Sequence, residues 1–183
     1  MTRNPCEFLR QTVQSPDDGL DRESSRQARL AAVRWLGLAR KPSGQVRDFL
    51  QRQGFDASII SGVIDELKNE GKIDDLRLAR QKTKTRSGAK SESSFRISQR
   101  LSAQGLDQNA IEQALVDHPA DCELALAALQ GKFRQPLDLA AGTIEQKNKY
   151  YRFLMSRGFT SEIVREAIRE FLKGISIQDD FTD

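Results

Sequence analysis

The sequence predicts an all-α protein, built as three tandem three-helix repeats that form an elongated, curved modular array. Three observations favour this fold class. One short phrase, Leu-x-x-x-Gly followed by a large apolar residue, occurs three times, with its glycines 51 and 53 residues apart. Apolar residues recur at the same offsets beyond each glycine, at helical spacing. No segment shows the alternation typical of a strand.

Each phrase predicts a corner at which one helix ends and the next begins. Glycine readily adopts the left-handed conformation that ends a helix, and the apolar residue after it contacts the preceding turn. We interpret these residues as structural and assign them no chemistry. The corner pairs are Gly54 with Phe55, Gly105 with Leu106, and Gly158 with Phe159. The helix caps expected after them are Asp56, Asp107 and Thr160.

The first repeat is predicted over residues 25–71, after a mobile N-terminal leader at residues 1–24. The leader mixes Pro, Asp, Ser and Gln without a sustained apolar period. Ser43 follows a proline and is expected to cap the second helix. The three helices of this repeat are predicted over residues 28–39, 43–53 and 57–70.

The second repeat is predicted over residues 72–119 and the third over 120–174, with an acidic tail at 175–183. The adjacent acids Asp74 and Asp75 precede an apolar helical period, so we interpret them as helix-capping residues in preference to an acid–base pair. Asp121 is expected to cap the first helix of the third repeat. A Ser-, Gly- and Lys-rich loop spans residues 87–94.

Composition bounds the class of protein. The 183 residues carry a net charge of +3, and 38% of them are hydrophobic and 30% charged; this lean apolar and high charged content favours several small cores. No stretch approaches the ~18 apolar residues of a membrane span. The start of the chain lacks the apolar segment of a signal peptide. Cys6 and Cys122 do not form a disulfide framework, so we expect a cytoplasmic protein without a membrane partner.

The sequence offers no set of catalytic residues. It has no phosphate-binding loop of the Walker type and no Gly-x-Gly-x-x-Gly. The single histidine, His118, lies beside a proline, and it would not share a helix face with Cys122. We therefore expect a protein that is not an enzyme and that uses neither a metal nor a cofactor.

The strongest charge feature is a basic band between residues 77 and 100. It holds eight cations and one acid, Glu92, which favours an acidic or polyanionic partner. The alternative is an ordinary solvated helix face, with Arg77 or Arg80 paired to acids a turn away. Phe95 next to Arg96 is an aromatic–basic pair that suits a base, although a core position is the interpretation we favour for it and for Trp35. The cations of the band are Arg77, Arg80, Lys82, Lys84, Arg86, Lys90, Arg96 and Arg100.

Three segments together resemble the RecX family, bacterial regulators of the RecA recombinase. They are Asp-Asp-x-Arg-x-Ala at 74–79, Phe95-Arg96-Ile97 and Arg-Phe-Leu-x-x-Arg-Gly-Phe at 152–159. The resemblance covers roughly residues 28–173. The chain departs from the family's usual pattern at Val46, at Leu78 and in the longer loop before Arg96.

The resemblance implies a non-enzymatic protein that docks on the RecA–single-stranded DNA filament. Such a protein restrains RecA's ATP hydrolysis, its strand exchange and the co-protease activity that triggers the SOS response of DNA repair. On this hypothesis the chain is a monomer, its contacts are the basic band with Arg152 and Arg157, and any contact with single-stranded DNA is indirect or weak. The alternative hypothesis is a stand-alone helical-repeat protein that binds nucleic acid by neutralising phosphates.

Overall fold

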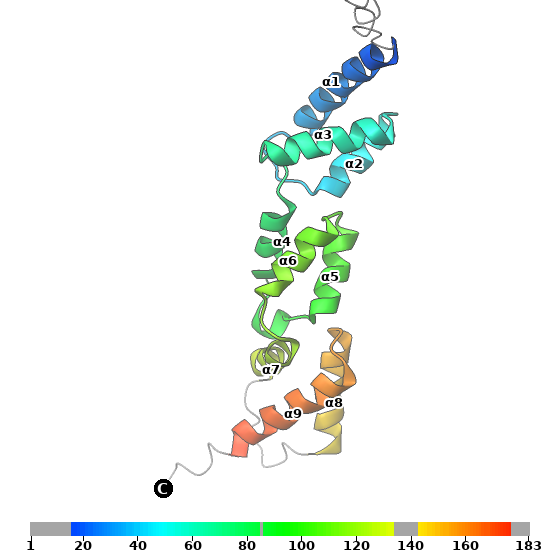
Figure 1. Ribbon diagram of the computed structural model, residues 1–183. Coiled ribbons are helices and arrows are strands. Elements are labelled where there is room, and N and C mark those ends of the chain that lie inside the picture. The colour runs from blue at the N-terminus through cyan, green and yellow to red at the C-terminus, as the bar shows by residue number, and fades with distance from the viewer. Residues whose placement is uncertain (1–15, 85, 134–142, 177–183) are drawn as a thin grey trace, which may run out of the picture. The chain divides into compact units, whose positions relative to one another are not determined.

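The computed structural model describes residues 16–84, 86–133 and 143–176. These residues form α-helices and one short 3-10 helix, and they contain no strand, which confirms the all-α prediction (Figure 1). Within these ranges no helix is both long enough and apolar enough to span a membrane. The helices are α1 (Pro16–Leu36), α2 (Ser43–Arg52), α3 (Ala57–Asn69), α4 (Asp75–Lys84), η2 (Gly88–Lys90), α5 (Ser94–Ala103), α6 (Gln108–Val116), α7 (Asp121–Lys132), α8 (Ile144–Ser156) and α9 (Ser161–Ser176).

The chain divides into two compact units, with the boundary between Ile73 and Asp74. The first unit holds α1 to α3, and the second unit holds α4 to α9. The predicted second and third repeats therefore lie in one compact unit, although each keeps an apolar cluster of its own. The elongated, curved form of the array stays a prediction.

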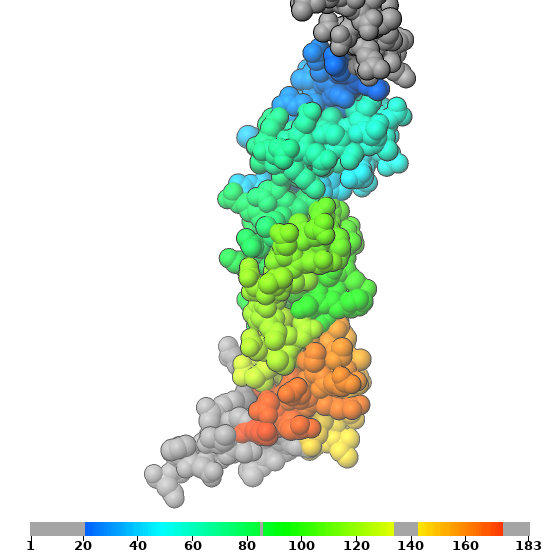
Figure 2. All heavy atoms as spheres, viewed as in Figure 1, coloured from blue at the N-terminus to red at the C-terminus, as the bar shows by residue number. Residues whose placement is uncertain are grey.

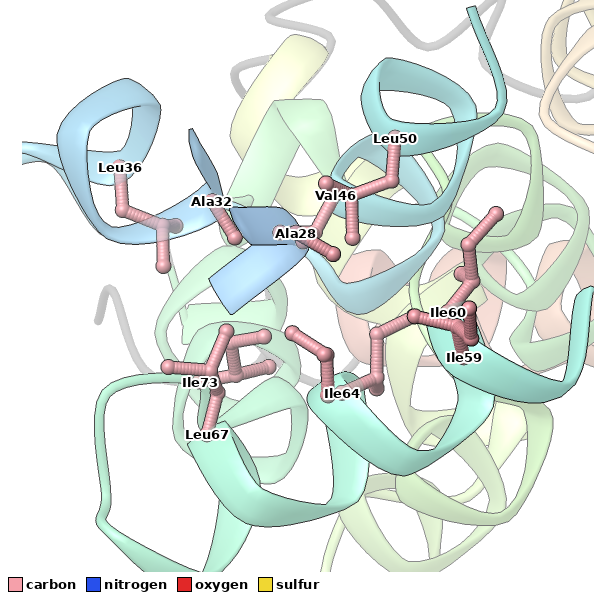
Figure 3. Packing of buried hydrophobic residues seen from close by; sticks show 11 residues of the cluster. Ala28, Ala32, Leu36, Val46, Leu50, Ile59, Ile60, Ile64, Leu67 and Ile73 are labelled. Carbon is pink, nitrogen blue, oxygen red and sulfur yellow. The ribbon is translucent and has the colours of Figure 1, made fainter. Parts of the chain in front are cut away.

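The first unit closes around one apolar cluster. Helix α3 contributes a continuous stripe that includes Ile60, Ile64 and Leu67, and α1 contributes small residues that let the helices approach closely (Figure 3). Trp35 stacks on Phe49 at 4.8 Å between ring centroids and packs against this cluster, as predicted for a core residue.

The second unit contains two apolar clusters. One joins α4, α5 and α6 around Leu78, Ile97 and Leu101. The other joins α7, α8 and α9 around Leu129, Leu154 and Phe171. In the second cluster the Tyr150 and Phe171 rings meet edge-to-face at 5.5 Å, a favourable aromatic geometry.

The three predicted corners are confirmed in atomic detail. Each glycine has a positive φ of 84–86°, and its N–H and that of the next residue bond back to carbonyls of the preceding helix in the Schellman pattern. In each corner the bond from the apolar residue reaches the leucine that opens the phrase. These bonds run from Phe55 N to Leu50 O (3.3 Å), from Leu106 N to Leu101 O (3.2 Å) and from Phe159 N to Leu154 O (3.4 Å).

Two predicted helix limits in the first unit are wrong. Helix α1 begins at Pro16, so residues 16–24 are helical where a leader was expected. The same helix ends at Leu36, before Ala39, because Gly37 adopts a left-handed φ of 54°. At the other end of the chain, α9 continues to Ser176, two residues into the predicted tail, and 177–183 lie outside the described residues.

Five of the predicted caps show three different outcomes. Asp74 accepts a hydrogen bond from Arg77 N at 2.8 Å, and Asp107 accepts bonds from two N–H groups of α6, so both cap as expected. Asp56 occupies the cap position of α3 without a side-chain bond to it. Ser43 and Asp121 were expected to cap, but each is the first residue of its helix, after Pro42 and Ala120 respectively.

Candidate partner-binding surface

Helix α4 separates a buried face from an exposed basic face. Leu78, Ala79 and Thr83 are buried on one side. Arg77, Arg80 and Lys84 follow at spacings of three and four residues on the other side, and all three are exposed. We call these three cations the α4 stripe. Helical spacing in the sequence is enough to separate these three cations from the buried face of α4.

Lys82 belongs to the basic band in sequence but not to the α4 stripe. It is half-buried, and its Nζ donates to Gln104 Oε1 at 2.6 Å. This bond ties α4 to the end of α5 in the same unit. The structure therefore gives Lys82 a role in the fold.

Glu92, the one acid in the band, is the centre of a buried ion-pair network. The residue is 6% exposed, and its carboxylate accepts from Arg86 Nη1 and from Arg100 Nε at 3.0 Å. A buried carboxylate needs such partners, because burial of an unpaired charge is strongly unfavourable. Arg86 and Arg100 therefore neutralise Glu92, and both cations are engaged within the fold.

The loop before α5 is anchored to the predicted third repeat. Ser93 N donates to Arg157 O at 3.1 Å, and Asp121 Oδ1 accepts from both the N–H and the hydroxyl of Ser94 at 2.8 Å. Asp121 thus bonds the first turn of α5, the task it takes in place of capping α7. In the space-filling view the green atoms of α5 meet the orange atoms of the α8–α9 corner (Figure 2).

Two glycines allow this close approach. A Cβ on Gly131 of α7 would lie 2.3 Å from Ala89 N, and one on Gly158 would lie 2.9 Å from Ser93 Oγ. Side chains at these positions are therefore excluded unless the loop moves. The contacts explain why the second and third predicted repeats form one compact unit.

The cations of the third corner are partly engaged. The Arg157 guanidinium lies 5.0 Å from the Phe153 ring centroid. A Cβ built on Gly158 would lie 3.0 Å from Arg96 Cβ, so Arg96 packs against this corner. Arg152 is exposed, with its Nε 3.4 Å from Asn148 O. The structure thus brings Arg96 and Arg157 to one corner.

Phe95 corrects a prediction. The side chain expected in the core is 66% exposed, because Ile97 and Leu101 take the buried face of α5. Phe95 and Arg96 are both exposed, so they form the aromatic–basic pair that was the less favoured interpretation of the sequence.

A cavity of about 610 Å³ opens beside the α4 stripe. Its basic side is formed by Arg80, Lys84 and Arg86, and its apolar side by Ala114, Pro119 and Leu124. Spacing in the sequence does not reveal this cavity, because its two sides are some 30 residues apart in the chain. Within it, Arg80 Nη2 lies 3.3 Å from Asp117 Oδ2, an ion pair with a different element and not with an acid a turn away.

Other predicted features have simple outcomes. No group of His, Cys, Asp or Glu suited to a metal ion occurs among the described residues. Cys122 is exposed and has a free thiol, while Cys6 lies outside the described residues. Lys90 is exposed on η2.

Comparison with known proteins matches this architecture. The model for the second three-helix domain of RecX matches residues 74–115, and the model for the third three-helix domain matches residues 120–168. The regulatory protein RecX of Clostridium botulinum (strain Alaska E43 / Type E3) is 31% identical over 144 residues, 78% of this chain and 67% of that protein. The chain belongs to the RecX family.

Further relatives agree with this membership. The regulatory protein RecX of Prosthecochloris aestuarii is 26% identical over 148 residues, which cover 81% of this chain and 95% of that protein. The crystal structure of RecX from Lactobacillus salivarius is 21% identical with a TM-score of 0.63, covering 82% of this chain and 97% of that one. The latter likeness concerns the fold.

Proposed function

We propose that this RecX-family chain binds the RecA–single-stranded DNA filament and restrains RecA's ATP hydrolysis, strand exchange and co-protease activity. It acts as a cytoplasmic monomer and as a binding protein, without a reaction or cofactor of its own. The family membership and the regulatory-protein names of its relatives support this proposal.

The observation that carries the proposal is the division of the basic band between fold and solvent. Lys82, Arg86 and Arg100 serve internal contacts. In contrast, Arg77, Lys84 and Lys90 are exposed and form no ion pair among the described residues. Exposed charges without internal partners are available to an acidic partner, where they steer association and fix register.

We therefore narrow the proposed contact set. Arg77, Arg80 and Lys84 form the α4 stripe, and Lys90, Arg96 and Arg152 are further exposed cations of the same unit. Lys82, Arg86, Arg100 and Arg157 support the fold and contribute to binding indirectly. Repeated weak contacts along a filament add up by avidity, so no single cation has to be strong.

The test is direct. Purified protein is expected to sediment with RecA filaments assembled on single-stranded DNA, and to lower the RecA ATPase rate at stoichiometric amounts. Filaments without added protein give the baseline. An unchanged ATPase rate at stoichiometric protein rejects the proposal.

A second candidate function is stand-alone binding to single-stranded nucleic acid, and the exposure of Phe95 favours it. Bases stack on exposed aromatic side chains, and neighbouring cations such as Arg96 neutralise phosphates. This function predicts that a labelled oligo(dT) binds without RecA, that affinity falls steeply with salt, and that Phe95→Ala weakens binding. A flat salt response or an unchanged affinity of Phe95→Ala argues against it.

A further inference from the structure

The cavity beside the α4 stripe is a concave feature of the second unit. At about 610 Å³ it lies within the range of ligand-binding pockets, and it is shared by α4, the loop after it, the end of α6 and the start of α7. Its two sides differ in chemistry, so an occupant has to satisfy both.

The cations on the basic side of the cavity are partly exposed. Arg80 and Arg86 keep about half of their side-chain surface exposed (51% and 43%), although they pair with Asp117 and Glu92. Lys84 is exposed and forms no ion pair within the described part of the chain. Arg80 is paired with Asp117 and Arg86 with Glu92, so Lys84 is the cation of this side that is left to an anionic group.

The apolar side decides between classes of anionic occupant. Ala114, Pro119 and Leu124 form an aliphatic wall, and the described lining contains no Phe, Tyr or Trp. Single-stranded nucleic acids are bound through stacking of successive bases on aromatic rings, and the described lining offers only the one imidazole of His118 for this. An aliphatic wall next to cations suits a peptide whose apolar side chain is flanked by carboxylates.

We propose that this cavity binds an acidic peptide segment of the partner protein, with an apolar side chain against Ala114, Pro119 and Leu124 and a carboxylate on Lys84. The inference deepens the proposed function and rests on it for the identity of the partner. Contacts with nucleic acid would then involve the exposed Phe95 and Arg96 and not this cavity.

The experiment uses the full chain and a fluorescein-labelled peptide in which Phe-Leu is flanked on both sides by aspartates, with anisotropy as the readout. Lys84→Glu should weaken binding about tenfold, and Lys84→Gln less, because a charge-assisted contact is lost. Lys147→Glu is the matched control: it makes the same charge change at an exposed lysine of α8, outside the cavity lining and outside the proposed contact set. It should change the affinity by no more than about twofold, because salt screens distant charges.

A second peptide tests the apolar side. Replacing Phe-Leu by Ser-Ser in the peptide should abolish measurable binding. Equal affinity for both peptides, equal losses in Lys84→Glu and Lys147→Glu, or no binding by the unmodified chain would each overturn the inference. Loss of oligo(dT) binding in Lys84→Glu without peptide binding would assign the cavity to nucleic acid and overturn it too. Since RecA is absent from this titration, its failure leaves the ATPase test of the proposed function intact.

Discussion

The two compact units close their cores by different means. Among the described residues, the buried polar side chains of the first unit are limited to Ser43. The second unit buries Asp75, Thr83 and the consecutive Ser91, Glu92 and Ser93. Apolar packing therefore suffices for the first unit, whereas polar bonds connect the two apolar clusters of the second.

This difference shows that a basic band in a sequence can contain two kinds of cation, those needed by the fold and those available to a partner. In the second unit some cations are needed to neutralise a buried acid, and only the remainder is available to a partner. The first unit buries no acid among its described residues, and its ion pairs, such as those of Arg29 and Lys72 with Glu70, lie at the surface. The predictions below use one unit as the internal reference for the other.

The largest effect is expected from Glu92→Ala. It leaves Arg100, with 20% side-chain exposure, and the more exposed Arg86 without their carboxylate. Loss of one partner of a largely buried pair costs about 2–4 kcal/mol, reduced here by the exposure of Arg86. Urea unfolding followed by circular dichroism should show this loss.

The single tryptophan makes the comparison sharper. Trp35 lies in the first unit, so its fluorescence reports that unit, while circular dichroism reports both. Glu92→Ala should shift the circular-dichroism transition and leave the Trp35 transition in place. An equal shift of both transitions would contradict the independence of the two cores.

A pair of glycine substitutions gives the next largest contrast. Gly131→Ala in α7 should destabilise the second unit by about 1–3 kcal/mol, because its Cβ would lie 2.3 Å from backbone Ala89 N. Gly62→Ala in α3 meets no atom within 4 Å, and should stabilise the first unit by up to about 1 kcal/mol.

Thermal unfolding of both variants checks this prediction. The midpoint should fall for Gly131→Ala and rise for Gly62→Ala. If Gly131→Ala is neutral, the loop at Ala89 is free to move, and the anchoring of that loop to α7 is not a rigid contact.

The smallest effect is a pH dependence in the first unit. Hydrogen bonds from Lys72 and Arg29 hold the pKa of Glu70 below its ordinary value of 4.5. A carboxylate with a lowered pKa in the folded state contributes stability above its unfolded pKa and loses it as the pH falls through the folded pKa. Because Glu70 is on the surface, the contribution is small.

Urea titrations of the unmodified chain and Glu70→Gln, followed by Trp35 fluorescence from about pH 7 to about pH 3, measure it. The unmodified chain should be the more stable at neutral pH, and the difference should shrink as the pH falls. A difference that is constant across this range would show that the charge of Glu70 does not contribute.

The sequence predicted the corners well because their chemistry is local. Each corner needs a left-handed φ at its glycine, which is Gly54, Gly105 or Gly158. The residues that specify this conformation are neighbours of that glycine in the sequence. Limits that depend on weaker local preferences, such as the start of α1 at Pro16, were missed.

The candidate surface was predictable only in part. Helical spacing indicates that Arg77 and Lys84 share a face, and this was open to sequence reasoning. The burial of Glu92 between Arg86 and Arg100, and the meeting of Lys84 with Pro119 in one cavity, depend on tertiary packing. Phe95 was misplaced because its neighbour Ile97 carries an equally strong apolar signal and takes the buried face.

The central claim is that cations without a role in the fold carry partner binding. The most direct measurement is RecA ATPase inhibition by Arg77→Ala/Lys84→Ala/Lys90→Ala, against Arg34→Ala/Arg40→Ala/Arg47→Ala, which removes the same charge from exposed positions of the first unit. The first variant should require about tenfold more protein for the same inhibition, and the second should inhibit as the unmodified chain does. Equal inhibition by the two variants would contradict the account.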